Sequence, residues 1–152
     1  MNELLVGFEL IKQDIIALYD EKGMRASGKF AESLEVEASE YNVKLWGEDY
    51  AQQLETGRNS GGFPPLADIR KWIIDKGVFA EALRTITLSS LAFLIARKIA
   101  NSGWNRERFG GVELISQIVT PERIQMIIDQ VGAVEAFRVE TEIIQMFNKI
   151  EV

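Results

Sequence analysis

The 152-residue chain contains neither cysteine nor histidine. The absence of cysteine excludes disulfides, thiolate zinc sites and cysteine nucleophiles. The absence of histidine removes the commonest general base and the commonest metal ligand of proteins. Catalysis would have to rest on carboxylates, lysine, tyrosine, serine or threonine, and these show no catalytic, cofactor-binding or metal-binding pattern. The sequence therefore predicts a protein that is not an enzyme and that carries no cofactor.

Long apolar runs and a surplus of basic residues are also missing. No segment approaches the roughly 18 consecutive apolar residues needed to span a bilayer, so we expect no membrane partner. The first residues, Met1-Asn2-Glu3, are acidic rather than basic, unlike a secretory signal. Lysine and arginine number 17 against 23 aspartates and glutamates, a formal net charge of −6. A protein that grips nucleic acid usually has a concentrated basic face instead.

What is present fits an ordinary globular domain. The chain is 47% hydrophobic and 26% charged, as is typical of such proteins, and its length suits one domain. Segments with helical apolar spacing are interrupted by a short region with a two-residue period. We predict a single α+β domain over residues 1–152, with a long N-terminal helix. Two or three further helices would pack on a small, mostly antiparallel β-sheet.

Four helices follow from apolar residues three and four positions apart. The first is predicted over residues 2–22, with one apolar stripe. The stripe comprises Leu4, Leu5, Phe8, Ile11, Ile15, Leu18 and Tyr19. A helix over residues 87–101 is apolar around much of its circumference, so we expect it to be the most buried element. Its core residues would be Leu91, Ile95 and Ile99. Another helix is predicted from Leu66 to Gly77, and a fourth from Thr120 to Gly132, where threonine and proline favour a helix start.

Alternating apolar and polar residues over 33–39 and 42–47 predict a β-hairpin. Trp46 would pack in the core, or else lie exposed at an interface. The acids Glu35 and Glu37 share a face of the first strand, which we interpret as its solvated face. The segment 134–147 also alternates and is predicted to be a strand, although the absence of turn residues leaves a helix open.

Two glycine-containing loops are candidates for partner binding. An exposed loop is predicted at 57–65, with three glycines followed by Pro64-Pro65. It is either displayed for a partner or a simple connection, and its glycine spacing matches no phosphate-binding motif. The loop 103–111 carries two aromatics and two arginines, which form an interface or tuck against the domain. The candidate partner or oligomer contacts are Arg58, Asn59, Phe63, Trp104, Arg106, Arg108 and Phe109.

The order of the motifs over roughly residues 1–110 is informative. The sequence Ser27-Gly28-Lys29 precedes the first strand, and Leu45-Trp46-Gly47 ends the hairpin. The segment from Tyr50 to Arg58, with Glu55-Thr56-Gly57-Arg58, then leads into the Gly/Pro loop. Next come Trp72-Ile73 with Lys76-Gly77, and the helix Leu91–Ile99 before Gly103. This order resembles the small tail-completion and neck proteins of tailed bacteriophages, the virion morphogenesis proteins that join head to tail.

The resemblance implies a non-enzymatic virion protein made in the cytoplasm of a bacterial host. Members of the family typically form homo-oligomeric rings between the portal-side adaptor and the tail tube. DNA would pass through such a ring without specific binding, and we expect part of the acidic surplus to face the channel. The first candidates for lumen-facing acids are Glu35, Glu37 and Glu40.

Two other functions remain open. A small nucleic-acid-binding regulator could use the 65–77 helix as its reader, because Arg70, Lys71 and Trp72 lie on it. The net charge of −6 and the dispersed basic residues oppose this alternative. A carboxylate-based hydrolase is suggested only by the acid pairs Glu35/Glu37 and Glu140/Glu142.

Overall fold

A computed structural model describes residues 2–39, 42–78, 86–104 and 113–150. In the described part of the chain six helices accompany one two-stranded antiparallel sheet. The elements are α1 (Asn2–Glu21), α2 (Lys29–Ser33), β1 (Glu35–Ala38), β2 (Val43–Trp46), α3 (Ala51–Thr56), α4 (Leu66–Lys76), α6 (Leu88–Ser102) and α7 (Pro121–Ile150). The predicted α+β class, with a long N-terminal helix, is confirmed.

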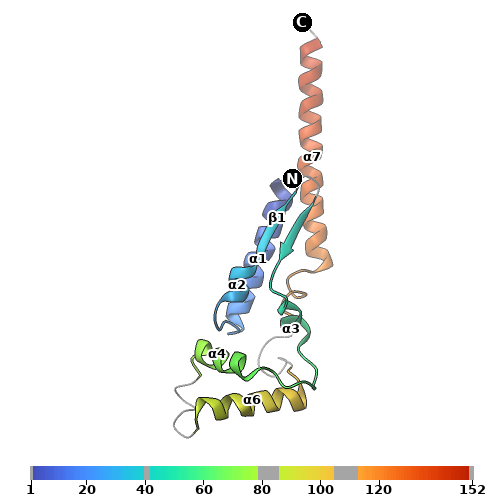
Figure 1. The fold of residues 1–152 in the computed structure, drawn as a ribbon. Helices are drawn as coiled ribbons and strands as arrows, with labels where there is room; N and C mark the ends of the chain where they lie inside the picture. The colour runs from blue at the N-terminus through green and yellow to red at the C-terminus, as the bar shows by residue number, and fades with distance from the viewer. Residues whose placement is uncertain (1, 40–41, 79–85, 105–112, 151–152) are drawn as a thin grey trace.

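The molecule is elongated (Figure 1). Helix α1, the hairpin and the first half of α7 lie side by side in its middle. Helices α4 and α6 pack together at one end, across the direction of α1. The second half of α7 projects at the opposite end and carries the C-terminus.

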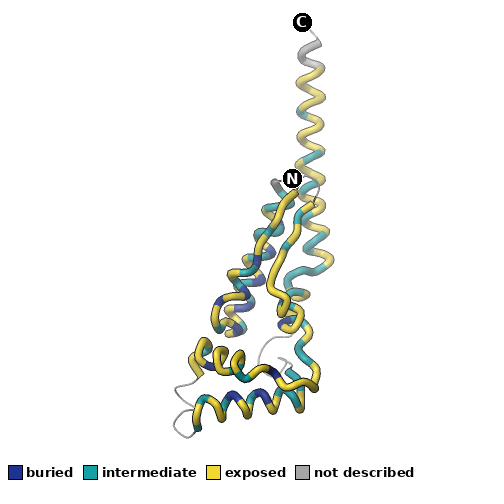
Figure 2. The backbone as a smooth tube through the Cα atoms, in the orientation of Figure 1, coloured by how far each residue is buried: buried dark blue, intermediate teal, exposed yellow. Residues whose placement is uncertain are grey.

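The core lies between α1, the hairpin, α3 and the segment before α7. Its fully buried side chains include Ile11 and Ile15 of α1, Phe30 of α2 and Leu114. The Phe30 ring lies 4.9 Å from the Tyr19 ring. Figure 2 shows this burial concentrated where α1 and α2 face the rest of the domain. The short helix α2, which we did not predict, exists because Phe30 anchors it in this core.

The observed hairpin confirms the predicted pair of strands, and its register shows which residues lie on its inner and outer faces. Val36 pairs with Leu45 on the face toward α1, while Glu37 pairs with Lys44 on the outer face. Trp46 follows Lys44 by two residues and shares that outer face. It is 53% exposed, and its indole N–H donates to the Glu37 carboxylate over 2.7 Å. The expectation that Trp46 packs in the core is therefore wrong.

Helix α6 is not the most buried element, contrary to our prediction. Helix α6 packs on α4, and its fully buried residues are Ala92 and Ala96, as is Ile73 on α4. Leu91, Ile95 and Ile99 are only half-buried, so the core positions predicted for them are wrong. The reason is location, because α6 lies at the end of the molecule and packs mainly on α4.

The largest correction concerns the C-terminal segment. Residues 134–147 form no strand, and the helix that begins at Pro121 continues through Gly132 to Ile150. The alternation of Phe137, Val139, Thr141 and Ile143 does not reflect a buried face, because three of these four side chains are exposed. An apolar pattern reports secondary structure only where a face is buried.

The position of α7 is fixed by its close contact with α1, by its N-terminal cap and by the attachment of the segment that precedes it. An added Cβ at Gly7 would lie 2.8 Å from the Ile127 side chain, so glycine permits the close approach of α1 and α7. At the start of α7, the predicted cap is present, since the Arg123 N–H donates to the Thr120 hydroxyl over 3.2 Å. Upstream, the Glu55 carboxylate of α3 accepts the N–H groups of Ile115 and Ser116 at 2.6 and 3.2 Å.

Candidate functional site

The structure brings the two glycine loops together. We call residues 57–63 and 103–104 the loop junction. Arg58 and Trp104 form an isolated antiparallel bridge, in which each N–H donates to the other's carbonyl over 2.7 Å. The Gly61 N–H donates to the carbonyl of Ala100 at the end of α6 over 2.8 Å. The loop after α3 is thereby attached to the end of α6.

Gly103 makes this junction possible. Its φ of 69° lies in the left-handed region that side chains disfavour. An added Cβ would also lie 2.3 Å from the carbonyl oxygen of Arg58. No neighbouring side chain can move to relieve that clash, because the obstacle is backbone.

The predicted contact residues at the junction have different surroundings. Asn59 is exposed, and Phe63 is 48% exposed with its ring 5.7 Å from that of Phe93 on α6. The half-buried Arg58 donates from its guanidinium to the Gly62 carbonyl over 2.7 Å. Trp104 is half-buried and packs against the core, which favours the alternative that it is tucked into the domain. The predicted contacts Arg106, Arg108 and Phe109 lie outside the described residues.

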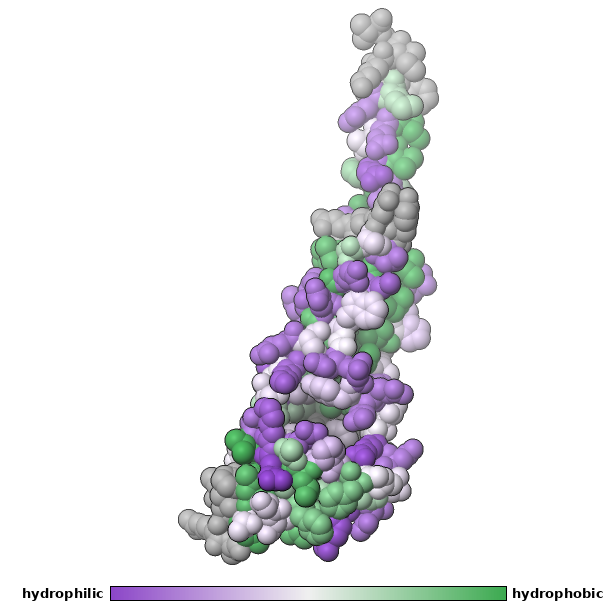
Figure 3. All heavy atoms as spheres, viewed as in Figure 1, coloured by the Kyte–Doolittle hydropathy of each residue, from purple (hydrophilic) through white to green (hydrophobic). Residues whose placement is uncertain are grey.

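A second surface, which we did not predict, is the projecting half of α7. We call residues 132–150 the arm. Almost every side chain described on it is exposed, although many are large and apolar. The exposed apolar side chains are Val134, Phe137, Val139, Ile143, Ile144 and Met146. Figure 3 shows hydrophobic side chains on the visible faces of the arm and of the α4–α6 end. Because exposed apolar patches often serve as interaction sites, the arm is a candidate partner surface.

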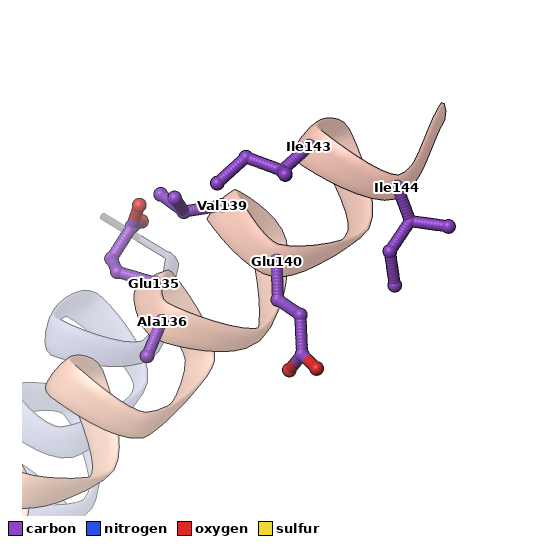
Figure 4. A pocket seen from close by; sticks show the side chains of 6 residues that line it. All are labelled: Glu135, Ala136, Val139, Glu140, Ile143 and Ile144. Atoms are coloured by element: carbon purple, nitrogen blue, oxygen red, sulfur yellow. The ribbon is translucent and has the colours of Figure 1, made fainter. Parts of the chain in front are cut away.

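The arm presents a surface rather than a cavity. A shallow patch is lined by Glu135, Ala136, Val139, Glu140, Ile143 and Ile144, all from α7 (Figure 4). Ala136, Val139 and Ile143 are spaced three and four residues apart and so share a face. Glu140 points away from Val139 and Ile143, on the side of the helix that also carries Ile144, and forms no ion pair with any described residue. The apolar spacing on this helix was the signal that could have revealed the arm in the sequence.

The titrating groups with shifted pKa values do not converge on a pocket. Burial, with nearby Tyr19 and Glu48, raises the pKa of Tyr50, whose ring lies 6.2 Å from that of Phe30. Hydrogen bonds from Arg25 lower the pKa of Asp20. Within the described ranges, no group of three acidic residues could hold a metal ion, and no buried side-chain polar atom lacks a hydrogen-bond partner.

No family model, curated protein or solved structure matches this chain.

Among the helices that the structure describes, none is both long enough and apolar enough to cross a membrane.

Proposed function

We propose that this chain is a non-enzymatic structural protein of the head–tail junction of a tailed bacteriophage. It would form a neck or tail-completion ring that links the portal or adaptor to the tail tube. The observation that carries the proposal is the exposed apolar arm at one end of an elongated domain. A monomer would have no use for such a surface, whereas an assembling subunit buries it.

The elongated shape supports ring assembly. The arm and the α4–α6 pair occupy opposite ends of the molecule and both expose apolar side chains. Contacts between two different patches are heterologous, and they close into a ring when the rotation between subunits permits. A ring of this kind is what the resemblance to neck and tail-completion proteins implies.

The motifs on which the resemblance rests support the same proposal, because their glycines lie at the starts and ends of helices. Gly28 of the Ser-Gly-Lys motif has a φ of 86° at the start of α2. Gly57 has a φ of 76° at the end of α3, and Gly77 a φ of 72° at the end of α4. These residues fix turns rather than supply reactive groups, as expected for an assembly protein. In the virion the partners would be portal, adaptor and tail-tube proteins, with DNA passing through unbound.

The nucleic-acid-binding alternative gains no support from α4. The Lys71 ammonium bonds to Asp75 over 3.0 Å, and the Arg70 Nε donates to the Leu66 carbonyl over 3.3 Å. Both basic groups are thus engaged on their own helix.

Native mass spectrometry and negative-stain microscopy of the full chain test the proposal. We expect closed rings whose formation requires the arm. Val139→Asp places a charge in the apolar face and should shift the population toward monomer. Gln145→Asp adds the same charge at an exposed polar position of the arm and should leave assembly unchanged. Particles purified from a phage-producing culture should also contain the protein by mass spectrometry. A chain that stays monomeric at high concentration and never joins particles would refute the proposal.

A further inference from the structure

Helix α6 bears an exposed apolar surface with basic neighbours. We call Phe93, Leu94, Arg97 and Lys98 the α6 face. Phe93 and Leu94 are 46% and 43% exposed, and both basic residues are exposed. The Arg97 guanidinium lies 5.9 Å from the centre of the Phe93 ring. Neither Arg97 nor Lys98 forms an ion pair with an acid in the described part of the chain.

The arm has the complementary character. Its apolar patch is flanked by Glu135 and Glu140. Its one basic residue over 135–146, Arg138, already lies 3.3 Å from Glu135 and 3.7 Å from Glu142. An apolar surface rimmed with acids matches one rimmed with bases, because complementary charges at an interface favour the correct partner.

Self-pairing of two arms is disfavoured by the same charges. Two copies packed through Val139 and Ile143 would bring the flanking glutamates of both arms together. Like charges placed across a helix pair oppose association. A different surface of the second copy is therefore the better occupant.

A groove between α1 and α7 also exposes apolar side chains, including Val6, Leu10 and Met126. Its basic residue, Arg123, is already bonded to Asp14. The groove therefore lacks the free positive charge that the arm's Glu140 would favour, and the α6 face has two such charges.

The dimensions and positions of the two helices agree with their pairing. At 1.5 Å per residue, α6 is about 22 Å long and the segment 135–146 about 18 Å. The α6 face and the arm lie at opposite ends of the molecule (Figure 1), so one subunit can offer its arm while receiving another on α6.

We propose that the arm of one copy packs on the α6 face of the next. Val139 and Ile143 would contact Phe93 and Leu94, and Glu140 would lie near Arg97 and Lys98. The contact is heterologous and can propagate around a ring. This inference deepens the proposed function and rests on its self-assembly.

Cross-linking tests the contact directly, because the chain has no native cysteine. One preparation of the full chain carries Val139→Cys and the other Leu94→Cys, both at exposed positions. After mixing, a short bismaleimide should join the two variants as a mixed dimer identified by mass spectrometry. Control pairs that replace Leu94→Cys with Val6→Cys or Ile74→Cys test the groove and α4 as receptors and should give no such product.

Charge reversal provides an independent test. Glu140→Lys alone and Arg97→Glu/Lys98→Glu together should each weaken assembly at least about tenfold, because each places like charges across the contact. Combining all three changes in one chain should restore assembly. Lys29→Glu, at an exposed position of α2 away from both surfaces, is a charge-reversal control and should assemble normally.

The outcomes separate this inference from the proposed function. The inference would be overturned if rings form but the mixed dimer between Val139→Cys and Leu94→Cys does not. It would also be overturned if cross-links form only between two arms or between the arm and the groove. Either outcome leaves the ring proposal standing. A chain that forms no oligomer at all would overturn both.

Discussion

Gly103 is the single residue on which the loop junction most depends. Its left-handed φ of 69° and the 2.3 Å approach of an added Cβ to the Arg58 carbonyl oxygen act together. Gly77 has nearly the same φ, 72°, but nothing lies within 4 Å of an added Cβ there. The two positions therefore separate backbone strain from steric clash.

We predict that Gly103→Ala destabilises the fold by more than about 2 kcal/mol, since left-handed strain alone costs about 1–2 kcal/mol and the clash adds to it. Gly77→Ala should cost only that strain, about 1–2 kcal/mol, because nothing lies close enough to clash with its Cβ. Urea denaturation followed by circular dichroism measures both. Equal losses for the two variants would show that the Arg58–Trp104 bridge relaxes without cost.

Asp20 and Arg25 form a two-bonded ion pair at the end of α1. The guanidinium donates to the two carboxylate oxygens over 2.6 and 2.9 Å. Hydrogen bonding by Arg25, followed by its charge, holds the pKa of Asp20 below its ordinary value of 3.8. A carboxyl with a lowered pKa in the folded state stabilises the fold above its unfolded pKa and loses that contribution as pH falls through the folded value.

Arg25→Gln should therefore return the pKa of Asp20 toward its ordinary value. The stability difference between this variant and the parent should be present at neutral pH and should disappear under acid conditions below the lowered pKa. Carboxyl-carbon NMR titration reads the first effect, and thermal melts across pH read the second. An Asp20 pKa that is the same in both proteins would mean that the pair does not persist in solution.

At the scale of elements, α4 offers a matched pair of isoleucines. Ile73 is fully buried against α6, whereas its neighbour Ile74 is 57% exposed. Ile73→Ala should cost about 2–5 kcal/mol, because it removes buried methyl groups and leaves a cavity. Ile74→Ala should change the free energy of unfolding by less than about 0.5 kcal/mol. Chemical denaturation of both variants checks this, and similar values would contradict the packing of α4 on α6.

The sequence correctly predicted those elements whose apolar pattern indicates a helix or strand and whose end residues indicate where it stops. The hairpin was correctly predicted because its inner face is half-buried and its outer face exposed, so the two-residue period reflects two different faces. Helix α4 was predicted with its end because Gly77 takes the left-handed conformation there. Helix α7 was partly missed, because the apolar residues of 134–147 also fit a two-residue alternation, and because Gly132 was interpreted as a helix end although the helix continues through it.

The candidate site was also predicted only in part from the sequence. The residues of the two glycine loops were identified from composition, but their pairing through Arg58 and Trp104 joins positions far apart in the chain. Local patterns carry no information on such contacts. Trp46 was misplaced because its residue type was weighted above its position, two residues from Lys44 on the outer face.

At the scale of the whole molecule, the net negative charge can be related to the acidic side chains on the outer face of the hairpin. Glu35 and Glu37 are exposed on β1, with Lys44 opposite Glu37 on β2. Glu40, the third acid that we expect to face a channel, lies outside the described residues. In a ring through which DNA passes, acids on the lumen repel phosphates and keep the duplex sliding, whereas lysines would release counterions and bind it. The alternative is that the net charge of −6 only maintains solubility and that the acids are not concentrated on any one face.

Reversing Glu35 and Glu37 to lysine distinguishes these possibilities. If the hairpin faces the channel, assembled rings of the double variant should retain duplex DNA, with an affinity that falls steeply as salt increases, while parent rings should not. The control is Asp68→Lys/Asp129→Lys, which makes the same change in net charge at exposed positions on α4 and α7. Gel-shift titrations of assembled rings at several salt concentrations provide the measurement. DNA retention by both double variants would mean that net charge alone governs binding. Retention by neither would place the hairpin away from the lumen, even if the chain assembles as a ring.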